Sequence, residues 1–332
     1  MIDIVGKRGW YFIFSALLII PGLISLIMPP GGWSTLDSGL NPGIDFTSGS
    51  VLDITFEQPV TQGQIQTRME ALGHPETLIQ GTGPRSAIIR TKVLEEGPGG
   101  GDSERQRIQD DLAQNVSPIA RGGVAYDSIS PIVAQETVRN AMLAMAAASL
   151  FILLYIWYAF RRVPKAYRYG ISAVVTLVHD TLIVLGIFSI LGRTMNMEVN
   201  SMFIVGILTV AGYSVNDTIV VFDRIRENVI RYPDRALDSV VNLSIVDTLA
   251  RSVNTSFTTF LVLLAMLLIG GNSIRELLLV VAIGVVVGTY SSICIASQFL
   301  VIWDRGEMGR FVGRGRRATA TAAAGLLSLI GR

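Results

Sequence analysis

The chain has 332 residues, of which 50% are hydrophobic and 16% are charged, and its formal net charge is +1. The apolar residues are gathered into long runs, which indicates a membrane protein. The near-zero net charge argues against a nucleic-acid partner. The single cysteine, Cys294, excludes an internal disulfide.

Six apolar segments are long enough to cross a membrane as helices. A hydrocarbon core of about 30 Å needs about 20 helical residues, and each span must satisfy its own backbone. No small-residue cleavage site follows the first segment, so we expect it to be a retained helix and not a signal peptide. The expected spans are 10–28 and, within 139–303, the segments 139–160, 170–191, 201–222, 253–269 and 277–303.

Lysine and arginine residues predict the orientation. The N-terminal segment 1–9, the connections after the second and fourth spans, and the tail 304–332 are all basic. The short connections on the other side hold only Arg193 and Arg275. The positive-inside rule therefore places both termini in the cytoplasm.

A polar stretch, residues 35–135, separates the first two spans and is predicted to fold as an extracytoplasmic domain. Its hydrophobic pattern alternates between that of strands and that of helices. The order β-α-β-β-α-β predicts a small α+β domain with a ferredoxin-like fold. The expected elements are strands at 50–57, 76–80, 86–93 and 124–129, and helices at 61–72 and 102–115.

The connection between the fourth and fifth spans, about 234–250, has apolar residues at helical spacing. This pattern predicts an amphipathic helix lying along the membrane surface. A helix packed on the connecting loops is the alternative. The apolar positions are Leu237, Val240, Val241, Ile245 and Leu249.

Two carboxylates lie within the expected spans. Asp180 follows His179 in the third span, and Asp217 follows Asn216 in the fourth. Ionisable residues inside a membrane are functional candidates because their burial is costly. For Asp180 a hydrogen-bonded packing role between helices is an equally good interpretation, and a lone histidine such as His179 is more often structural.

Asp217 lies close to the cytoplasmic end of its span. It precedes Phe222 by five residues, hence by about 7.5 Å along a helix, and Arg251 begins the fifth span on the same side. We therefore expect Arg251 to reach Asp217 and to form a pair that responds to protonation. A static ion pair, or a carboxylate that extends toward water, is the alternative.

Glycines in two spans predict close helix packing. Gly206 and Gly212 lie in the fourth span, and Gly284 and Gly288 lie in the sixth at GxxxG spacing. Small residues allow helix backbones to approach closely, and static packing accounts for most such motifs. No nucleotide site, metal cluster or nucleophile–base arrangement is visible, so we expect no cofactor, no metal and no enzymatic activity.

Several strings of residues resemble the SecF family. The longest, Gly212 to Asn228 in the fourth span, is long enough to be highly specific. The resemblance covers nearly the whole chain. The other matching strings, in the expected order, are Gly43–Gly49, Ser130-Pro131, His179-Asp180, Arg251–Thr259 and Gly288–Ser292.

The string after the first span is the family motif of the external domain. Its residues Gly43, Asp45, Phe46 and Gly49 match the family, whereas Ser48 stands where the family usually has glycine. That departure affects a turn which glycine enters more freely than serine.

The resemblance implies one half of a bundle of the resistance-nodulation-division type, paired with the six helices of SecD. In that family the acid and the arginine at the positions of Asp217 and Arg251 are implicated in proton passage, together with an aspartate of SecD. We expect Asp180 and Asn216 as further members of the proton pathway. Ser252, where the family usually has threonine, keeps the hydroxyl group. The pair expected from the positions of Asp217 and Arg251 in their spans is therefore the same pair that the resemblance implies.

The resemblance also implies a place in the cell and a set of partners. We expect a protein of the bacterial cytoplasmic membrane that uses the proton motive force to assist protein export. The expected partners are SecD, the SecYEG translocon with its associated small membrane subunit, translocating preproteins and protons.

Three other functions deserve comparison. A lipid or drug exporter of the same superfamily predicts a second large external domain, for which the loop 192–200 is too short. An intramembrane aspartyl protease would carry Gly-x-Gly-Asp, whereas Asp217 follows Ser214-Val215-Asn216. A non-conducting assembly factor of the translocon is distinguished by measuring proton flux.

Overall fold

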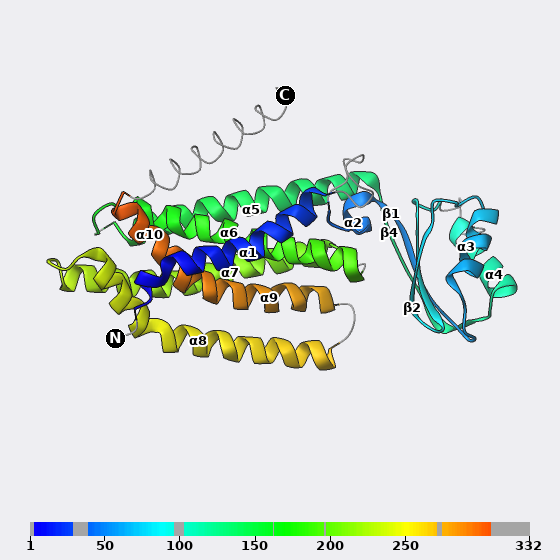
Figure 1. The fold of residues 1–332 in the computed structure, drawn as a ribbon. Coiled ribbons are helices and arrows are strands. Elements are labelled where there is room, and N and C mark those ends of the chain that lie inside the picture. Colours follow the sequence, from blue (N-terminus) through cyan, green and yellow to red (C-terminus); the bar gives the residue numbers. More distant parts are fainter. Residues whose placement is uncertain are drawn as a thin grey trace, which may run out of the picture. The chain divides into compact units, whose positions relative to one another are not determined.

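The described residues of the computed structural model form two compact units (Figure 1). The helical unit comprises Met1–Leu40, Met145–Met197 and Met202–Arg332, and the α+β unit comprises Asn41–Ala144 and Glu198–Ser201. The structure describes residues 3–28, 39–95, 103–161, 163–195, 197–270 and 274–306. The expected tail, 304–332, therefore lies outside the described residues from position 307 onward.

Within the described residues, six helical segments are long and apolar enough to cross a membrane. This confirms a helical membrane protein with six candidate spans. The last span is interrupted by a π-helical turn, Ser292–Ala296, between α9 and α10. The helices are α1 (Arg8–Ile27), α5 (Pro131–Ala159), α6 (Tyr167–Met195), α7 (Ser201–Arg231), α8 (Leu237–Ile269), α9 (Arg275–Ser291) and α10 (Ser297–Asp304).

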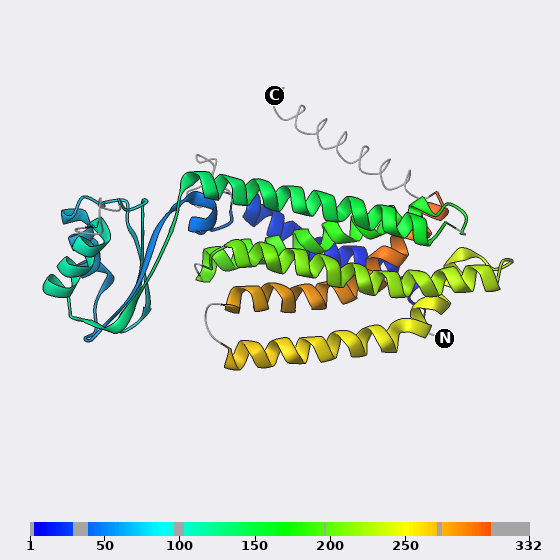
Figure 2. The same cartoon turned by 180° about the vertical axis from the view of Figure 1, so that it is seen from behind.

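The spans differ in how much of their surface is buried. In the most apolar stretch of each span, 50 to 61% of the residues are buried for α6, α7 and the last span, against 6 to 11% for α1, α5 and α8. The first three therefore form the inner part of the helical unit, and the others line its outside. Figure 2 shows α8 and α9 running side by side.

The segment expected as a separate amphipathic helix is instead the first part of α8, which continues without a break from Leu237 to Ile269. Its apolar side packs against α7, and Asn228 Nδ2 donates a 2.9 Å hydrogen bond to Ser244 Oγ. Arg224 on α7 forms an ion pair with Asp247. The apolar residues therefore lie on one side of the helix, as expected, but that side packs against α7 and not against the membrane surface.

The α+β unit has the predicted element order. Its four-stranded sheet has the strand order β2-β3-β1-β4, with every neighbouring pair antiparallel. Side chains such as Leu52 and Ile89 of the sheet pack with Ile65 of α3 and Leu112 of α4 in one apolar core. The elements are α2 (Ile44–Thr47), β1 (Gly49–Phe56), α3 (Gln62–Ala71), β2 (Leu78–Gly83), β3 (Ser86–Thr91), α4 (Glu104–Asn115) and β4 (Ile119–Ile129).

The turn between α2 and β1 is strained at Ser48. Its φ of 65° and ψ of 165° lie in a region that is essentially restricted to glycine. We expect Ser48→Gly to raise the free energy of unfolding by about 1 kcal/mol, because relief of strain outweighs the entropy cost of glycine. Thermal unfolding of the full chain in detergent measures this, with Ser48→Ala as the control. An equal gain in the alanine variant would contradict the strain account.

Candidate functional site

Asp180 is fully buried in the middle of α6, and both of its carboxylate oxygens have partners. Oδ2 accepts hydrogen bonds from the hydroxyls of Ser214 on α7, at 2.5 Å, and Ser291 on α9, at 2.7 Å. Oδ1 lies 2.8 Å from Nδ1 of His179. This carboxylate therefore connects the three inner helices at one point.

The network extends from Asp180 to α1. Nε2 of His179 lies 2.9 Å from Oγ of Ser15, which lies 3.3 Å from the hydroxyl of Tyr290. That hydroxyl donates a 2.7 Å hydrogen bond to the backbone oxygen of Tyr11. A continuous polar path thus crosses from the inner helices to the outer helix α1.

The π-helical turn in the last span affects which side chains face this network. A π-helical turn adds a residue to the turn and often marks a functional site. Ser291 donates to Asp180, while the next residue, Ser292, lies 2.8 Å from the hydroxyl of Thr218 on α7. Adjacent serines at the start of the turn therefore both bond across the inner helices.

Asp217 is the second buried carboxylate, with 6% of its surface exposed. Its carboxylate lies near the hydroxyl group of Ser252 on α8. Among the described residues, however, neither Asp217 Oδ2 nor Ser252 Oγ has a hydrogen-bond partner. Buried polar atoms without partners are costly and uncommon. Asp217 therefore differs from Asp180, whose oxygens are both engaged.

The expected pair of Arg251 and Asp217 is not formed as an ion pair in this structure. No hydrogen bond or ion pair joins them in the described part of the chain, and Arg251 is exposed. The reason is rotational: successive helical residues point about 100° apart. Because Ser252 is the residue of α8 that turns toward Asp217, its neighbour Arg251 points elsewhere.

Arg251 belongs to an exposed polar face formed by α7 and α8. The two helices meet where Tyr213 donates a 3.1 Å hydrogen bond to Ser256. The threonine hydroxyls on this face bond to carbonyls of the preceding turn, so Asn216, Arg251 and Asn254 are the residues poorly suited to lipid. The exposed polar face comprises Thr209, Gly212, Asn216, Arg251, Asn254, Thr255 and Thr258.

Three of the four predicted packing glycines lie between α7 and α9. A Cβ on Gly206 would lie 2.7 Å from Val280, one on Gly284 would lie 2.0 Å from Val210, and one on Gly288 would lie 3.0 Å from Ser214. These helices therefore approach too closely for larger residues.

Gly212 differs from the other predicted glycines. It is exposed, and a Cβ there would have nothing within 4 Å. A close glycine contact that sequence reasoning missed joins Gly22 of α1 to Gly186 of α6, where a Cβ on Gly22 would lie 2.6 Å from the other Cα. Gly22 and Gly186 are isolated glycines in apolar runs, so the sequence around them gave no pattern that indicated their contact.

The motif after the first span forms what we call the α7 anchor, composed of Gly43, Asp45, Glu198, Val199 and Ser201. The Gly43 backbone N–H donates to the Val199 oxygen at 2.8 Å. Oδ2 of Asp45 accepts a 2.6 Å hydrogen bond from the N–H of Ser201, the first residue of α7. Acids at a helix N-terminus are stabilising. The motif thus holds the start of the helix that carries Asp217.

A charged pair supports the α7 anchor. Arg90 on β3 forms an ion pair with Glu198, in which both side chains are largely buried. Burial raises the pKa of Glu198, although the Arg90 guanidinium acts in the opposite direction. Lowering the pH toward that pKa would therefore weaken the pair.

Two other motif residues shape the chain beside the α7 anchor. Gly49 has a φ of 133°, and a Cβ there would lie 2.7 Å from the Thr91 oxygen, so glycine is required on both counts. Phe46 is half-buried, and its N–H donates to the Gly43 oxygen at 3.0 Å.

Sequence reasoning missed Ser15, Ser214, Tyr290 and Ser291 as members of the Asp180 network. Three of them lie within strings that resemble the SecF family, which was the available signal. Ser15 is a single hydroxyl in an apolar run. Among the described residues, no group of three or more His, Cys, Asp or Glu side chains is placed to hold a metal ion.

Two family models match the sequence. One, described as protein export membrane protein SecD/SecF, C-terminal, matches residues 109–306. The other, the SecD/SecF GG motif, matches residues 33–60 and so includes the Gly43 and Asp45 part of the α7 anchor.

Individual relatives agree with these models. The chain is 38% identical to the protein translocase subunit SecF of Thermobaculum terrenum, with 98% of this chain and 100% of that protein covered. It is 32% identical to the protein translocase subunit SecDF of Bacillus subtilis, covering 92% of this chain but 38% of the relative. A crystal structure of SecDF, a translocon-associated membrane protein, from Thermus thermophilus matches with a TM-score of 0.76 at 29% identity, covering 92% of this chain and 39% of that chain.

Six candidate spans around buried carboxylates define a multi-pass membrane protein of the transport class, with no sign of catalysis in the described residues. The family models and the relatives named above are protein-export proteins. The chain belongs to the SecD/SecF family, and its full-length similarity is to the SecF subunit of the protein-export complex.

Proposed function

We propose that this chain binds protons at Asp217 and converts their passage into movements that assist protein export, as the SecF half of an assembly with SecD. The observation that carries the proposal is a buried carboxylate with an unpartnered oxygen, next to an exposed polar face. That oxygen is available to take up a proton. The proposal extends to the setting: the bacterial cytoplasmic membrane, both termini in the cytoplasm, and SecYEG with its small associated subunit and preproteins as partners.

The energy available per proton is modest. A charge that crosses a membrane held at about 100 mV gains about 2.3 kcal/mol, which biases a two-state equilibrium about fifty-fold. We propose that protonation of Asp217 repacks α7 against α8 and α9, with Arg251 pairing to the ionised acid in another state of the cycle. The close contacts at Gly284 and Gly288 support a change between discrete packing positions of α7 against α9, because tightly packed interfaces do not deform continuously.

Asp180 has a different proposed part in the proton pathway. Its carboxylate is joined through His179 to Ser15 on α1, so a proton held there connects the inner helices to the outer one. Asn216 faces away from this network, on the exposed polar face. We assign Asn216 to contact with SecD, next to the proton-binding acid.

The exposed polar face is the proposed SecD interface. Asparagine and arginine side chains are rare on surfaces that face lipid, and small residues such as Gly212 favour close helix approach. A second bundle covering this face would complete an arrangement of the resistance-nodulation-division type. We also assign the α+β unit to a ferredoxin-like fold outside the cytoplasm, consistent with its sheet order.

Enlarging Gly212 tests this interface. We expect Gly212→Phe to reduce co-purification with SecD at least about tenfold without unfolding the chain, because Gly212 is exposed and a Cβ there has nothing within 4 Å. Gly9→Phe is a matched control, since a Cβ on Gly9 also has nothing within 4 Å.

The wild-type pair of SecD and this chain, reconstituted in vesicles under an imposed proton gradient, is expected to conduct protons. Unchanged association of the Gly212 variant would reject the interface, and absent flux would reject the proton role.

A further inference from the structure

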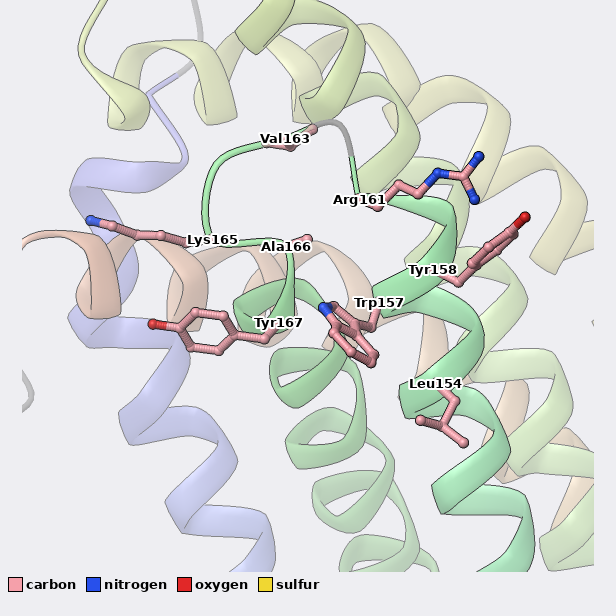
Figure 3. Close-up of a pocket in the computed structure, with 8 residues that line it drawn as sticks. All are labelled: Leu154, Trp157, Tyr158, Arg161, Val163, Lys165, Ala166 and Tyr167. Atoms are coloured by element: carbon pink, nitrogen blue, oxygen red, sulfur yellow. The ribbon is translucent and has the colours of Figure 1, made fainter.

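A pocket of about 640 Å³ lies at the turn between α5 and α6 (Figure 3). It is separate from Asp180 and Asp217, and none of its lining residues takes part in their contacts. Its walls come from the last turns of α5, from residues of the connection between α5 and α6, and from Tyr167, the first residue of α6. The pocket is therefore a feature that the proposed export function does not use.

The pocket is apolar at one end and cationic at the other. Leu154 precedes Arg161 by seven residues, which is about 10 Å along a helix, and Trp157 lies between them (Figure 3). In Figure 3 the side chains of Arg161 and Lys165 extend in opposite directions from the connection between the helices, so their charges lie on two sides of the pocket rim. This sequence of apolar wall, aromatic rings and cations matches the profile of a membrane interface.

The two pocket cations have no carboxylate partner among the described residues, unlike several other arginines at the same end of the bundle. Among the described residues, no ion pair or hydrogen bond holds the Lys165 ammonium, and the Arg161 guanidinium lies over the Tyr158 ring at 4.2 Å. No acidic residue lines the pocket. At the same end of the bundle, carboxylates pair with Arg168, Arg224, Arg226 and Arg305. The pocket is thus left with uncompensated positive charge.

Lys165 is also held in an unusual backbone conformation. Its φ of 58° lies in the left-handed region that glycine favours. A strained residue of this kind persists only where the surrounding structure imposes it, and such residues cluster at binding sites. Here the strained residue is the one that places a cation at the rim.

We propose that this pocket binds an anionic phospholipid, with the headgroup phosphate at the rim that carries Arg161 and Lys165 and an acyl chain along Leu154 and Trp157. Charge complementarity selects an anion, and the apolar wall selects one that carries a hydrocarbon chain. The outer surface of α5 supports this occupant, because nearby large apolar side chains such as Phe151 are 69% exposed. Binding does not depend on proton conduction.

Native mass spectrometry of the full chain tests the proposal. We offer the purified protein equal amounts of phosphatidylglycerol and phosphatidylcholine, and expect wild type to retain the anionic lipid about tenfold better. Arg161→Gln combined with Lys165→Gln is expected to remove that preference. Arg231→Gln combined with Arg235→Gln is the matched control: it removes the same charge at the same end, and Arg235 also stacks on a tyrosine, at 4.4 Å.

A second variant guards against misfolding. Lys165→Gly removes the ammonium while relieving the backbone strain, so we expect a fold at least as stable as wild type with a weakened lipid preference. An undiminished preference in the pocket variants would overturn the proposal. So would an equal loss in the control pair, which would indicate general surface charge, or displacement of the lipid by equimolar inorganic phosphate, which would indicate a simple anion site. Loss of SecD association with lipid binding unchanged would show a protein contact instead.

Discussion

Replacing Asp217 with asparagine is expected to abolish gradient-driven export while leaving the fold and the association with SecD intact. Asparagine has nearly the same shape, so the packing around Ser252 is kept, but an amide cannot exchange a proton near neutral pH. We expect at least a tenfold loss of export of a secreted reporter protein, and an equal loss of proton uptake by vesicles that contain SecD and this chain. Both readouts are measured on the same preparation.

Asp223→Asn is the matched control for this experiment. Asp223 lies on the same helix but is exposed and paired with Arg226 three residues later. Exposed pairs of this kind contribute little, so the control is expected to export at the wild-type rate. Normal export by the Asp217 variant would reject its proton-binding role. A variant that assembles and conducts protons but fails to export would move the defect to the coupling step.

The second large effect is expected at Asp180, where two substitutions separate packing from proton binding. Asp180→Ala leaves the hydroxyls of Ser214 and Ser291 and the ring of His179 without their acceptor. We expect a loss of about 3 kcal/mol in the free energy of unfolding, because several buried polar groups lose their partner together. Thermal unfolding in detergent measures the loss.

Asp180→Asn retains one acceptor oxygen and the side-chain volume, so its free energy of unfolding is expected to stay within about 1 kcal/mol of wild type. If the residue carries protons, as we propose, export is nevertheless reduced at least tenfold. Full export by a stable asparagine variant would assign Asp180 to packing alone. The alanine variant is then expected to fail in proportion to its lost stability.

Much of the fold was predictable because the membrane imposes a strong constraint on composition. Six apolar runs gave six candidate spans, and alternating patterns gave the order of strands and helices in the α+β unit. The break expected before the fifth span was wrong for a reason visible in the sequence. The stretch from Leu237 to Ile269 contains neither proline nor glycine, so nothing ends the helix where its amphipathic pattern gives way to an apolar one.

The sequence predicted how far along its helix each site residue lies, but not the direction in which its side chain points around the helix axis. Counting residues along a helix places Asp217 and Arg251 at similar heights, yet it does not give the direction in which each points. The structure turns Ser252 inward and leaves Arg251 exposed. The contacts of Asp180 depend on the packing of three helices, and on a π-helical turn that single-sequence patterns do not reveal.

Ser201 is both a member of the α7 anchor and the first residue of α7. Its N–H is held by the carboxylate of Asp45, within the α+β unit, and it begins the helix whose seventeenth residue is Asp217, about 24 Å further along the axis. A helix transmits axial displacement with little loss. If proton uptake slides α7, as we propose, the movement must either carry the residues of the α7 anchor with it or break their contacts, of which the hydrogen bond from Ser201 to Asp45 lies at the first residue of the helix.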